Sequence, residues 1–143
     1  MTAGYSGTPL PKKLGIRDGH RVATLGAPPG FPSLLGTLPT GVRLEADSRS
    51  RGPFDVIVAF ALSEPEMRAR FDRARRRLRT DGGLWICWPK RSSSLATDLA
   101  ERHVRAYGLS TGLVDNKICA VDEDWSGLRF VIRREDRPTR RSR

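Results

Sequence analysis

The clearest pattern in the chain is a pair of apolar runs separated by an amphipathic segment. The runs span Phe54–Phe60 and Leu84–Trp88. The segment between them begins at Ser63, in a Ser-Glu-Pro-Glu sequence that has the form of a capping box. Its apolar residues recur at helical spacing on one stripe: Met67, Phe71, Ala74 and Leu78. Two apolar strands joined by a helix form a parallel pair, so this unit predicts an α/β fold.

Further elements flank this unit on both sides. Short helical turns are predicted within Pro11–Ile16 and Phe31–Leu38, and a second full helix between a cap at Ser94 and a C′ glycine at Gly108. Four shorter strands are predicted: His20–Leu25, Val42–Ala46, Lys117–Val121 and Leu128–Ile132. The last two are close enough in sequence to form an antiparallel hairpin.

The predicted fold is therefore a single α/β domain over residues 1–134, with a mainly parallel sheet closed by a C-terminal antiparallel hairpin. Residues 135–143 lack apolar side chains and are predicted to form a basic disordered tail. One point of topology stays open, because residues 47–53 are too few for a helical crossover. Either Val42–Ala46 is a very short parallel strand followed by an extended loop, or it is not a parallel neighbour.

Charge suggests a partner class without proving one. The chain has 26 Lys and Arg against 16 Asp and Glu, a net charge of +10. Such a field favours polyanions, including nucleic acid, but an arginine-rich solvated surface is the interpretation that net charge alone favours. Cys87 and Cys119 each lie inside an apolar run and predict buried thiols. No leader-like or membrane-spanning apolar stretch is seen, so we expect a cytoplasmic protein without membrane contact.

The order of elements resembles the class I methyltransferase fold. The segment from Phe54 to Ile86 is similar to that family's fourth and fifth strands with the helix between them. Leu25–Phe31, with the sequence Leu-Gly-Ala-Pro-Pro-Gly-Phe, is similar to its cofactor loop, especially the version in RNA methyltransferases. The resemblance covers most of residues 14–133 and implies a Rossmann-like three-layer domain that binds S-adenosylmethionine.

The whole chain also resembles a set of short bacterial proteins that share a domain of unknown function. The segments that carry this resemblance are residues 4–10, 12–16, 88–90, 96–99 and 112–128. This second resemblance implies no activity.

Two departures from the methyltransferase pattern affect the functional prediction. Thr24 stands two residues before the first glycine of the loop, where the family normally carries a carboxylate that orders the cofactor. The interval between Asp47 and Phe54 has no room for the helix–strand–helix of the full fold. The chain is therefore predicted to be a shortened version of the fold with about six strands.

Candidate site residues follow from the geometry of open α/β sheets, which bind ligands beyond the carboxyl ends of their strands. Gly26 and Gly30 would line a cofactor, or would simply form a rigid turn. Asp47, like Glu45, would bind ribose hydroxyls, or would be a solvated carboxylate. Ser63 follows the third strand at the same edge, which completes the candidate cofactor set: Gly26, Gly30, Asp47 and Ser63.

A second candidate site follows the strand that ends at Trp88. Lys90, Arg91 and Ser92 form a polar cluster next to the predicted helix start at Ser94 and would bind an anion, or would be an exposed basic loop. The acidic run Asp122–Asp124 lacks the spacing of a calcium loop, so no metal site is predicted. No residue is assigned a catalytic role, and His103 is expected to be a partnered histidine at the edge of the core.

Two functions remain open from the sequence. The first, favoured by Thr24 and the shortened sheet, is a non-catalytic methyltransferase-like domain without a cofactor that binds an unknown partner or an anionic ligand. The second is an S-adenosylmethionine-dependent methyltransferase, with nucleic acid as a candidate substrate. In that case Lys90 and Arg91 would hold substrate phosphate.

Overall fold

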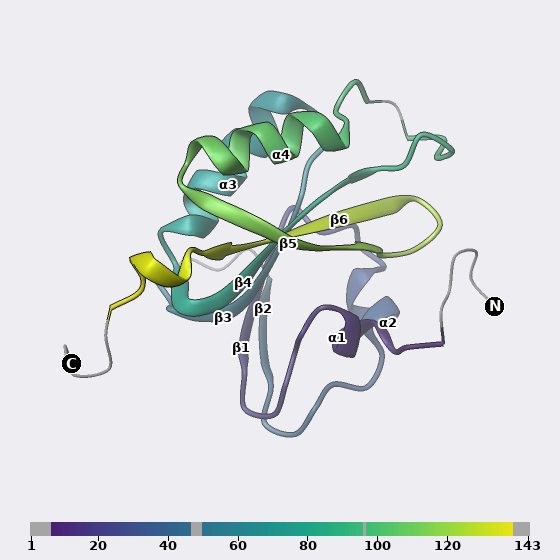
Figure 1. Cartoon of the computed structure of the whole chain (residues 1–143). Helices are drawn as coiled ribbons and strands as arrows, with labels where there is room; N and C mark the ends of the chain where they lie inside the picture. Colours follow the sequence, from purple (N-terminus) through teal and green to yellow (C-terminus); the bar gives the residue numbers. More distant parts are fainter. Residues whose placement is uncertain (1–6, 47–49, 96, 139–143) are drawn as a thin grey trace.

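A computed structural model describes residues 7–46, 50–95 and 97–138. The described chain forms one sheet with the strand order β2-β1-β3-β4-β6-β5 (Figure 1). The strands are β1 (Arg21–Leu25), β2 (Arg43–Ala46), β3 (Phe54–Phe60), β4 (Leu78–Pro89), β5 (Leu113–Ala120) and β6 (Trp125–Ile132). The helices are α1 (Leu10–Lys13), α2 (Phe31–Leu35), α3 (Glu64–Arg75), α4 (Glu101–Ser110) and the short 3₁₀ turn η1 (Arg134–Asp136).

The pairing of the strands confirms the predicted fold class. β1 pairs in parallel with both β2 and β3, and β3 pairs in parallel with β4. β6 then pairs antiparallel with both β4 and β5. The sheet is thus mainly parallel and is closed by the C-terminal hairpin β5–β6.

The alternation of side chains along the central strands gives the sheet two buried faces. In β3, Ile57 and Ala59 belong to one core cluster, while Val56 and Val58 belong to the other. Helices α3 and α4 cover the first face, and α1 and α2 lie on the opposite face (Figure 1). A buried hydrogen bond ties α1 to the sheet, because Trp85 Nε1 donates to the Leu14 carbonyl at 2.9 Å. The domain therefore has three layers, as predicted.

The boundary between α3 and β4 differs from the prediction. Met67, Phe71 and Ala74 form the expected buried stripe, but Leu78 is already the first residue of β4. The amide of Phe54 donates to the carbonyl of Arg77 at 2.8 Å and draws the chain into the sheet at this point. The register then shifts between Phe54 and Val56, which accommodates the extra residues before Gly83.

The second long helix also differs from the prediction, at both ends. Helix α4 begins at Glu101 with Ala100 as its N-cap, so Ser94 does not cap it. Instead, the Ser93 hydroxyl accepts a hydrogen bond from the Leu95 amide at 3.0 Å and holds the serine run in a turn. Gly108 is not the C′ residue but lies inside the helix, where the Phe130 ring occupies the space of its missing side chain.

The open question about Val42–Ala46 is resolved in favour of a short parallel strand. β2 has only four residues and pairs with β1 from Arg21 and Arg43 onward. The described part of the loop that follows, residues 50–53, contains no helix.

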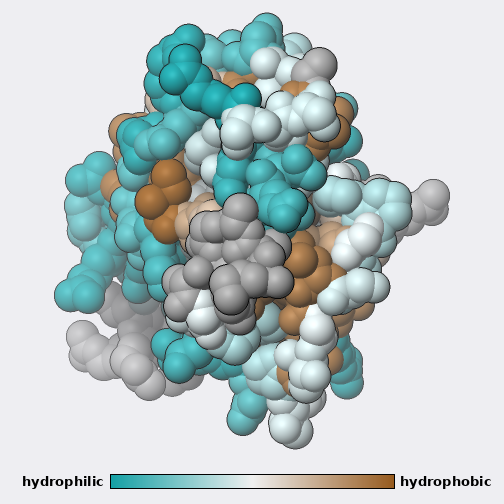
Figure 2. Space-filling model, turned by 90° about the vertical axis from the view of Figure 1, so that its right-hand side faces the viewer, coloured by the Kyte–Doolittle hydropathy of each residue, from teal (hydrophilic) through white to brown (hydrophobic). Residues whose placement is uncertain are grey.

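Two further expectations concern the exterior of the domain. None of the described helices is long and apolar enough to cross a membrane. Figure 2 shows the side on which the β5–β6 hairpin turns: hydrophilic residues predominate there, and apolar residues appear in small groups. Of the predicted tail at residues 135–143, the last five positions lie outside the described residues, and the domain boundary at 134 stays a prediction.

Candidate functional site

The loops at the carboxyl ends of the parallel strands are joined by hydrogen bonds. The amide of Ala61, after β3, donates to the Cys87 carbonyl of β4 at 3.0 Å. The amide of Lys90, after β4, donates to the carbonyl of Asp124 in the β5–β6 turn at 2.8 Å. The Ser93 hydroxyl also donates to the Asp124 carboxylate, at 2.9 Å. This edge is therefore one continuous site region.

The centre of this edge lies between β1 and β3, where the strand order reverses direction along the chain. Gly26 ends β1 with a φ of +65°, a conformation that glycine adopts without strain. The guanidinium of Arg70, on α3, lies where a side chain on Gly26 would stand. Arg70 is held there because it donates to the Phe60 carbonyl at the end of β3 and to the Glu66 carboxylate. Gly26 is thus needed for the close approach of a cation to the backbone.

Ser63 and Glu66 organise the start of α3. The Ser63 hydroxyl accepts a hydrogen bond from the Glu66 amide at 3.3 Å and acts as the N-cap, as the capping-box pattern predicts. Glu66 departs from the usual box, because its carboxylate accepts from the Leu62 amide at 2.9 Å rather than from Ser63. Glu66 is therefore placed to hold Arg70, and Ser63 serves primarily as a helix cap.

Gly30 lies in a different part of the edge. It lines a cavity of about 200 Å³ between the glycine loop and the β5–β6 turn. Three rings stack edge to face along this cavity: Phe31 on Phe60 and Phe60 on Trp125, each at 5.0 Å between centroids. Asp122 and Asp124 also line it. The cavity combines an aromatic wall with carboxylates, which suits a planar ring that carries polar groups.

Two acidic candidates, one within β2 and one directly after it, have different outcomes. Asp47 lies outside the described residues. Glu45 forms an ion pair with Arg21, with 3.0 Å between the carboxylate and guanidinium atoms. The Glu45 carboxylate is therefore already paired within the sheet, with the first residue of β1. Thr24, which replaces the carboxylate of the methyltransferase pattern, is almost fully buried in β1.

Lys90, Arg91 and Ser92 come together in one cavity of about 520 Å³, although not for the predicted reason. The expected helix start at Ser94 is absent, but the true start of α4 at Ala100 and Glu101 lines the same cavity. The cluster thus lies beside the N-terminus of α4, which the sequence pattern had wrongly placed at Ser94.

Other candidate chemistry is accounted for by structural contacts. The carboxylate of Asp122 accepts hydrogen bonds from the Asp124 and Trp125 amides and shapes the turn. His103 accepts a hydrogen bond from the Ala100 amide at 2.9 Å, so it is the partnered histidine that was expected. Among the described residues, no group of three or more His, Cys, Asp or Glu side chains is arranged to hold a metal ion.

Sequence reasoning missed Arg70, which appeared as one of many arginines on α3. Its position four residues after Glu66 was a usable signal, because residues at this spacing lie on the same helix face. Burial also affects the two thiols: it raises the pKa of Cys87 strongly and that of Cys119 to a smaller extent. Neither cysteine is therefore activated as a nucleophile.

Solved structures with the same fold include S-adenosylmethionine-dependent methyltransferases. A methyltransferase of this class from Aquifex aeolicus matches with a TM-score of 0.62 and 14% identity, over 85% of this chain and 87% of that chain. A precorrin-6y C5,15-methyltransferase from Geobacter metallireducens matches with a TM-score of 0.62 and 10% identity, over 87% and 86% of the two chains. Fibrillarin from Aeropyrum pernix, with S-adenosylmethionine bound, matches with a TM-score of 0.57 and 16% identity, over 90% and 70%.

No protein family matches the chain, and no curated protein matches it. The resemblance to short bacterial proteins therefore stays a prediction. The structural matches overturn the favoured expectation of a non-catalytic domain without a cofactor. The structures that match over most of both chains include two methyltransferases and a fibrillarin with S-adenosylmethionine bound, which favours the alternative. The chain has the Rossmann-like fold of the class I methyltransferases, in a form with six strands in the described sheet.

Proposed function

We propose that this chain binds S-adenosylmethionine at the carboxyl ends of β1 and β3 and acts as a methyltransferase. The observation that carries the proposal is the approach of the Arg70 guanidinium to the backbone of Gly26, at the point where the strand order reverses. Ligands of open α/β sheets bind at this point.

The chemistry of these residues suits the amino-acid end of the cofactor. A carboxylate is bound most strongly by a guanidinium, and Arg70 offers one beside an exposed backbone turn. An ammonium group needs acceptor oxygens, and the Phe60 carbonyl and the Glu66 carboxylate lie next to Arg70. These acceptor oxygens would take the role of the carboxylate that the methyltransferase family normally carries at the position of Thr24. The cavity beside Gly30, with its Phe31 and Trp125 walls, would take a planar ring.

When bound, S-adenosylmethionine supplies a methyl group on a positively charged sulfur. The role of the protein would be to orient the cofactor through Arg70 and Gly26 and to bind the substrate at the same edge of the sheet. We assign no general base, and the Asp122 and Asp124 carboxylates of the hairpin turn are already used in hydrogen bonds. Gly30, Ser63 and Asp47 remain secondary candidates for cofactor contact.

Nucleic acid is the substrate class that we favour. Lys90, Arg91 and Ser92 lie in a cavity at the same edge and would bind a substrate phosphate beside the start of α4. The net charge of +10 supports a polyanionic substrate. A fibrillarin with this fold from Methanococcus jannaschii is described as a pre-rRNA processing protein. We also propose a cytoplasmic location, as such a substrate requires contact with intracellular nucleic acid.

Calorimetric titration with S-adenosylmethionine tests the proposal. We expect the wild-type chain to bind, and Arg70→Met to weaken binding roughly tenfold by removing a charge-assisted hydrogen bond. Arg76→Met is the matched control, because Arg76 is an exposed arginine at the other end of α3. Thermal unfolding of each variant verifies that it is folded.

Failure to bind S-adenosylmethionine at about 1 mM, a concentration at which even weak cofactor sites fill, would sink the proposal. Equal losses in the Arg70 and Arg76 variants would remove Arg70 from the site. Transfer of a labelled methyl group to pooled RNA, lost in Lys90→Gln, would support the substrate class. Transfer to small molecules alone would contradict it.

A further inference from the structure

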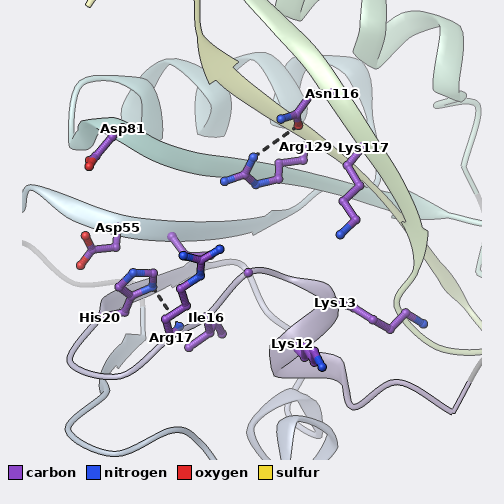
Figure 3. A pocket seen from close by; sticks show the side chains of 12 residues that line it. Lys12, Lys13, Ile16, Arg17, His20, Asp55, Asp81, Asn116, Lys117 and Arg129 are labelled. Carbon is purple, nitrogen blue, oxygen red and sulfur yellow. Dashed lines mark hydrogen bonds between the residues drawn. The ribbon is translucent and has the colours of Figure 1, made fainter. Parts of the chain in front are cut away.

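A third cavity lies at the opposite edge of the sheet, at the amino ends of the parallel strands. It has a volume of about 730 Å³, large enough for a nucleotide-sized ligand. His20 immediately precedes β1, and Asp55 lies at the start of β3. Figure 3 shows Lys117 and Arg129 entering from β5 and β6, with Arg17 on the opposite wall. Among the charged side chains of this cavity, cations outnumber carboxylates.

The register of the hairpin places two of these cations against each other. A β-bulge between Asp115 and Lys117 leaves Asn116 as an extra residue. After the bulge, Lys117 lies directly opposite Arg129 in the antiparallel ladder. Directly opposite residues share a face of the sheet, and like charges in such pairs repel each other. The pairing therefore has an unfavourable term that an anion between the two groups would offset.

Arg129 is embedded in the sheet and poorly satisfied. Its guanidinium lies over Gly83, where any side chain would collide with it. Its Nε is buried without a hydrogen-bond partner among the described residues, and its Nη1 reaches Asn116 only at 3.4 Å. Burial lowers the pKa of Arg129, and the nearby positive charges of Arg137 and Arg17 lower it further. These observations describe a fixed cation that lacks a counter-charge.

Arg17 lies on the other wall, where its backbone is held in place. The preceding residue, Ile16, is almost fully buried in the core. The amide of Arg17 donates to His20 Nδ1 at 3.1 Å, which fixes the turn. On the same wall, the Lys13 ammonium donates to the Ala120 carbonyl at 3.0 Å and links α1 to β5. The cavity walls are therefore held in place without a ligand.

The carboxylates of the cavity are already used elsewhere. Asp55 accepts a hydrogen bond from the Arg21 amide at 2.8 Å and pairs with Arg79 at 3.3 Å. Asp81 also pairs with Arg79, at 3.5 Å. Within the described residues, Arg17, Lys117 and Arg129 form no ion pair with a carboxylate. Positive charge is thus left unmatched on one side of the cavity.

We propose that this cavity is a phosphate-binding site, in which Arg17, Lys117 and Arg129 contact the phosphate groups of a nucleotide or of a nucleic-acid strand. Two guanidinium groups and an ammonium on rigid walls match a dianionic or longer phosphate chain. The site is separate from the carboxyl edge and does not depend on the proposed methyl transfer.

Titration of the full chain with inorganic pyrophosphate and with a labelled single-stranded oligonucleotide of about 12 nucleotides tests this site. We expect pyrophosphate to bind and to raise the thermal unfolding midpoint. Because Arg17 and Lys117 are exposed, the double variant Arg17→Gln/Lys117→Gln should fold normally. It should bind pyrophosphate at least about tenfold more weakly.

Arg75→Gln/Arg76→Gln is the matched control, since it removes the same charge from the exposed end of α3. Equal weakening in both double variants would overturn the site and indicate only net charge. No binding of either probe at low salt would also overturn it. Oligonucleotide binding that is lost in the Arg17/Lys117 variant assigns the cavity to nucleic acid, and pyrophosphate binding alone assigns it to small phosphate compounds. Titration of the same variant with S-adenosylmethionine should be unchanged, so this test stands apart from the carboxyl-edge site.

Discussion

The ring of Phe130 on β6 occupies the space in which a side chain at Gly108 on α4 would stand. This contact sets how closely α4 lies on the sheet. Gly108→Ala should gain up to about 1 kcal/mol of helix propensity. The overlap with Phe130 should cost more, on the order of 1–3 kcal/mol, because the core has no room for an added methyl group. Denaturant unfolding should therefore show a net loss of stability.

The double variant Gly108→Ala/Phe130→Leu isolates the cause. If the overlap is responsible, the alanine should cost less in this background than in the wild-type background. An equal cost in both backgrounds would point to a different constraint on Gly108.

The two glycines of the loop after β1 should respond differently to alanine. Gly26 has a φ of +65° and faces the Arg70 guanidinium, whereas Gly30 has a negative φ and open space around it. Gly26→Ala should lose about 1–2 kcal/mol from the left-handed backbone alone, and Gly30→Ala should change stability little. Thermal unfolding of the two variants provides the comparison. Similar losses at both positions would show that neither the left-handed backbone of Gly26 nor its contact with Arg70 sets the requirement.

The start of α4 offers a stabilising substitution. Ala100 is the N-cap, with extended backbone angles but no side-chain oxygen. Ala100→Ser should stabilise the protein by roughly 1 kcal/mol, because a hydroxyl would accept from the first turn of the helix. Ser94→Ala should be nearly neutral, since Ser94 is not a helix cap. A larger loss from Ser94→Ala than gain from Ala100→Ser would argue for a helix start near Ser94.

Tyr107 should make stability depend on pH at the alkaline end. Its hydroxyl donates to the Asp72 carboxylate at 2.6 Å, and this hydrogen bond is the main cause of its raised pKa. A pKa raised on folding means that the stabilisation is complete below the unfolded value near 10 and is lost as pH rises through the folded value. Tyr107→Phe should cost about 1 kcal/mol at pH 8 and progressively less above pH 10. A cost that stays constant to pH 12, measured by urea unfolding, would contradict this assignment.

The long elements could be predicted because their patterns are local. The continuous apolar run of β3 and the stripe Met67–Phe71–Ala74 are each patterns within a single element. The boundary at Leu78 could not be predicted in the same way. It depends on a hydrogen bond from Phe54 to Arg77, residues that are distant in sequence and are brought together only by the sheet.

The same difference applies to the candidate sites. Strand direction was enough to place the glycine loop, Ser63 and the Lys90–Ser92 cluster at one edge of the sheet. The contact of Arg70 with Gly26 depends on how α3 is packed, and the pairing of Lys117 with Arg129 depends on a bulge at Asn116. The spacing of Glu66 and Arg70 signals a pair within α3, but neither of these two tertiary relationships can be read from spacing, because both depend on how the elements pack.

The short strand β2 has a consequence for association between molecules. β2 and β5 are the two edge strands of the described sheet. The unpaired backbone of an edge strand can act as a template on which further chains pair. β2 offers only four residues and carries Arg43 and Glu45, while the bulge at Asn116 interrupts β5 next to the charged Lys117. At both edge strands, the regular stretch of backbone that could pair with another chain is therefore short. Short and interrupted edge strands are among the features by which sheets limit edge-to-edge pairing between molecules.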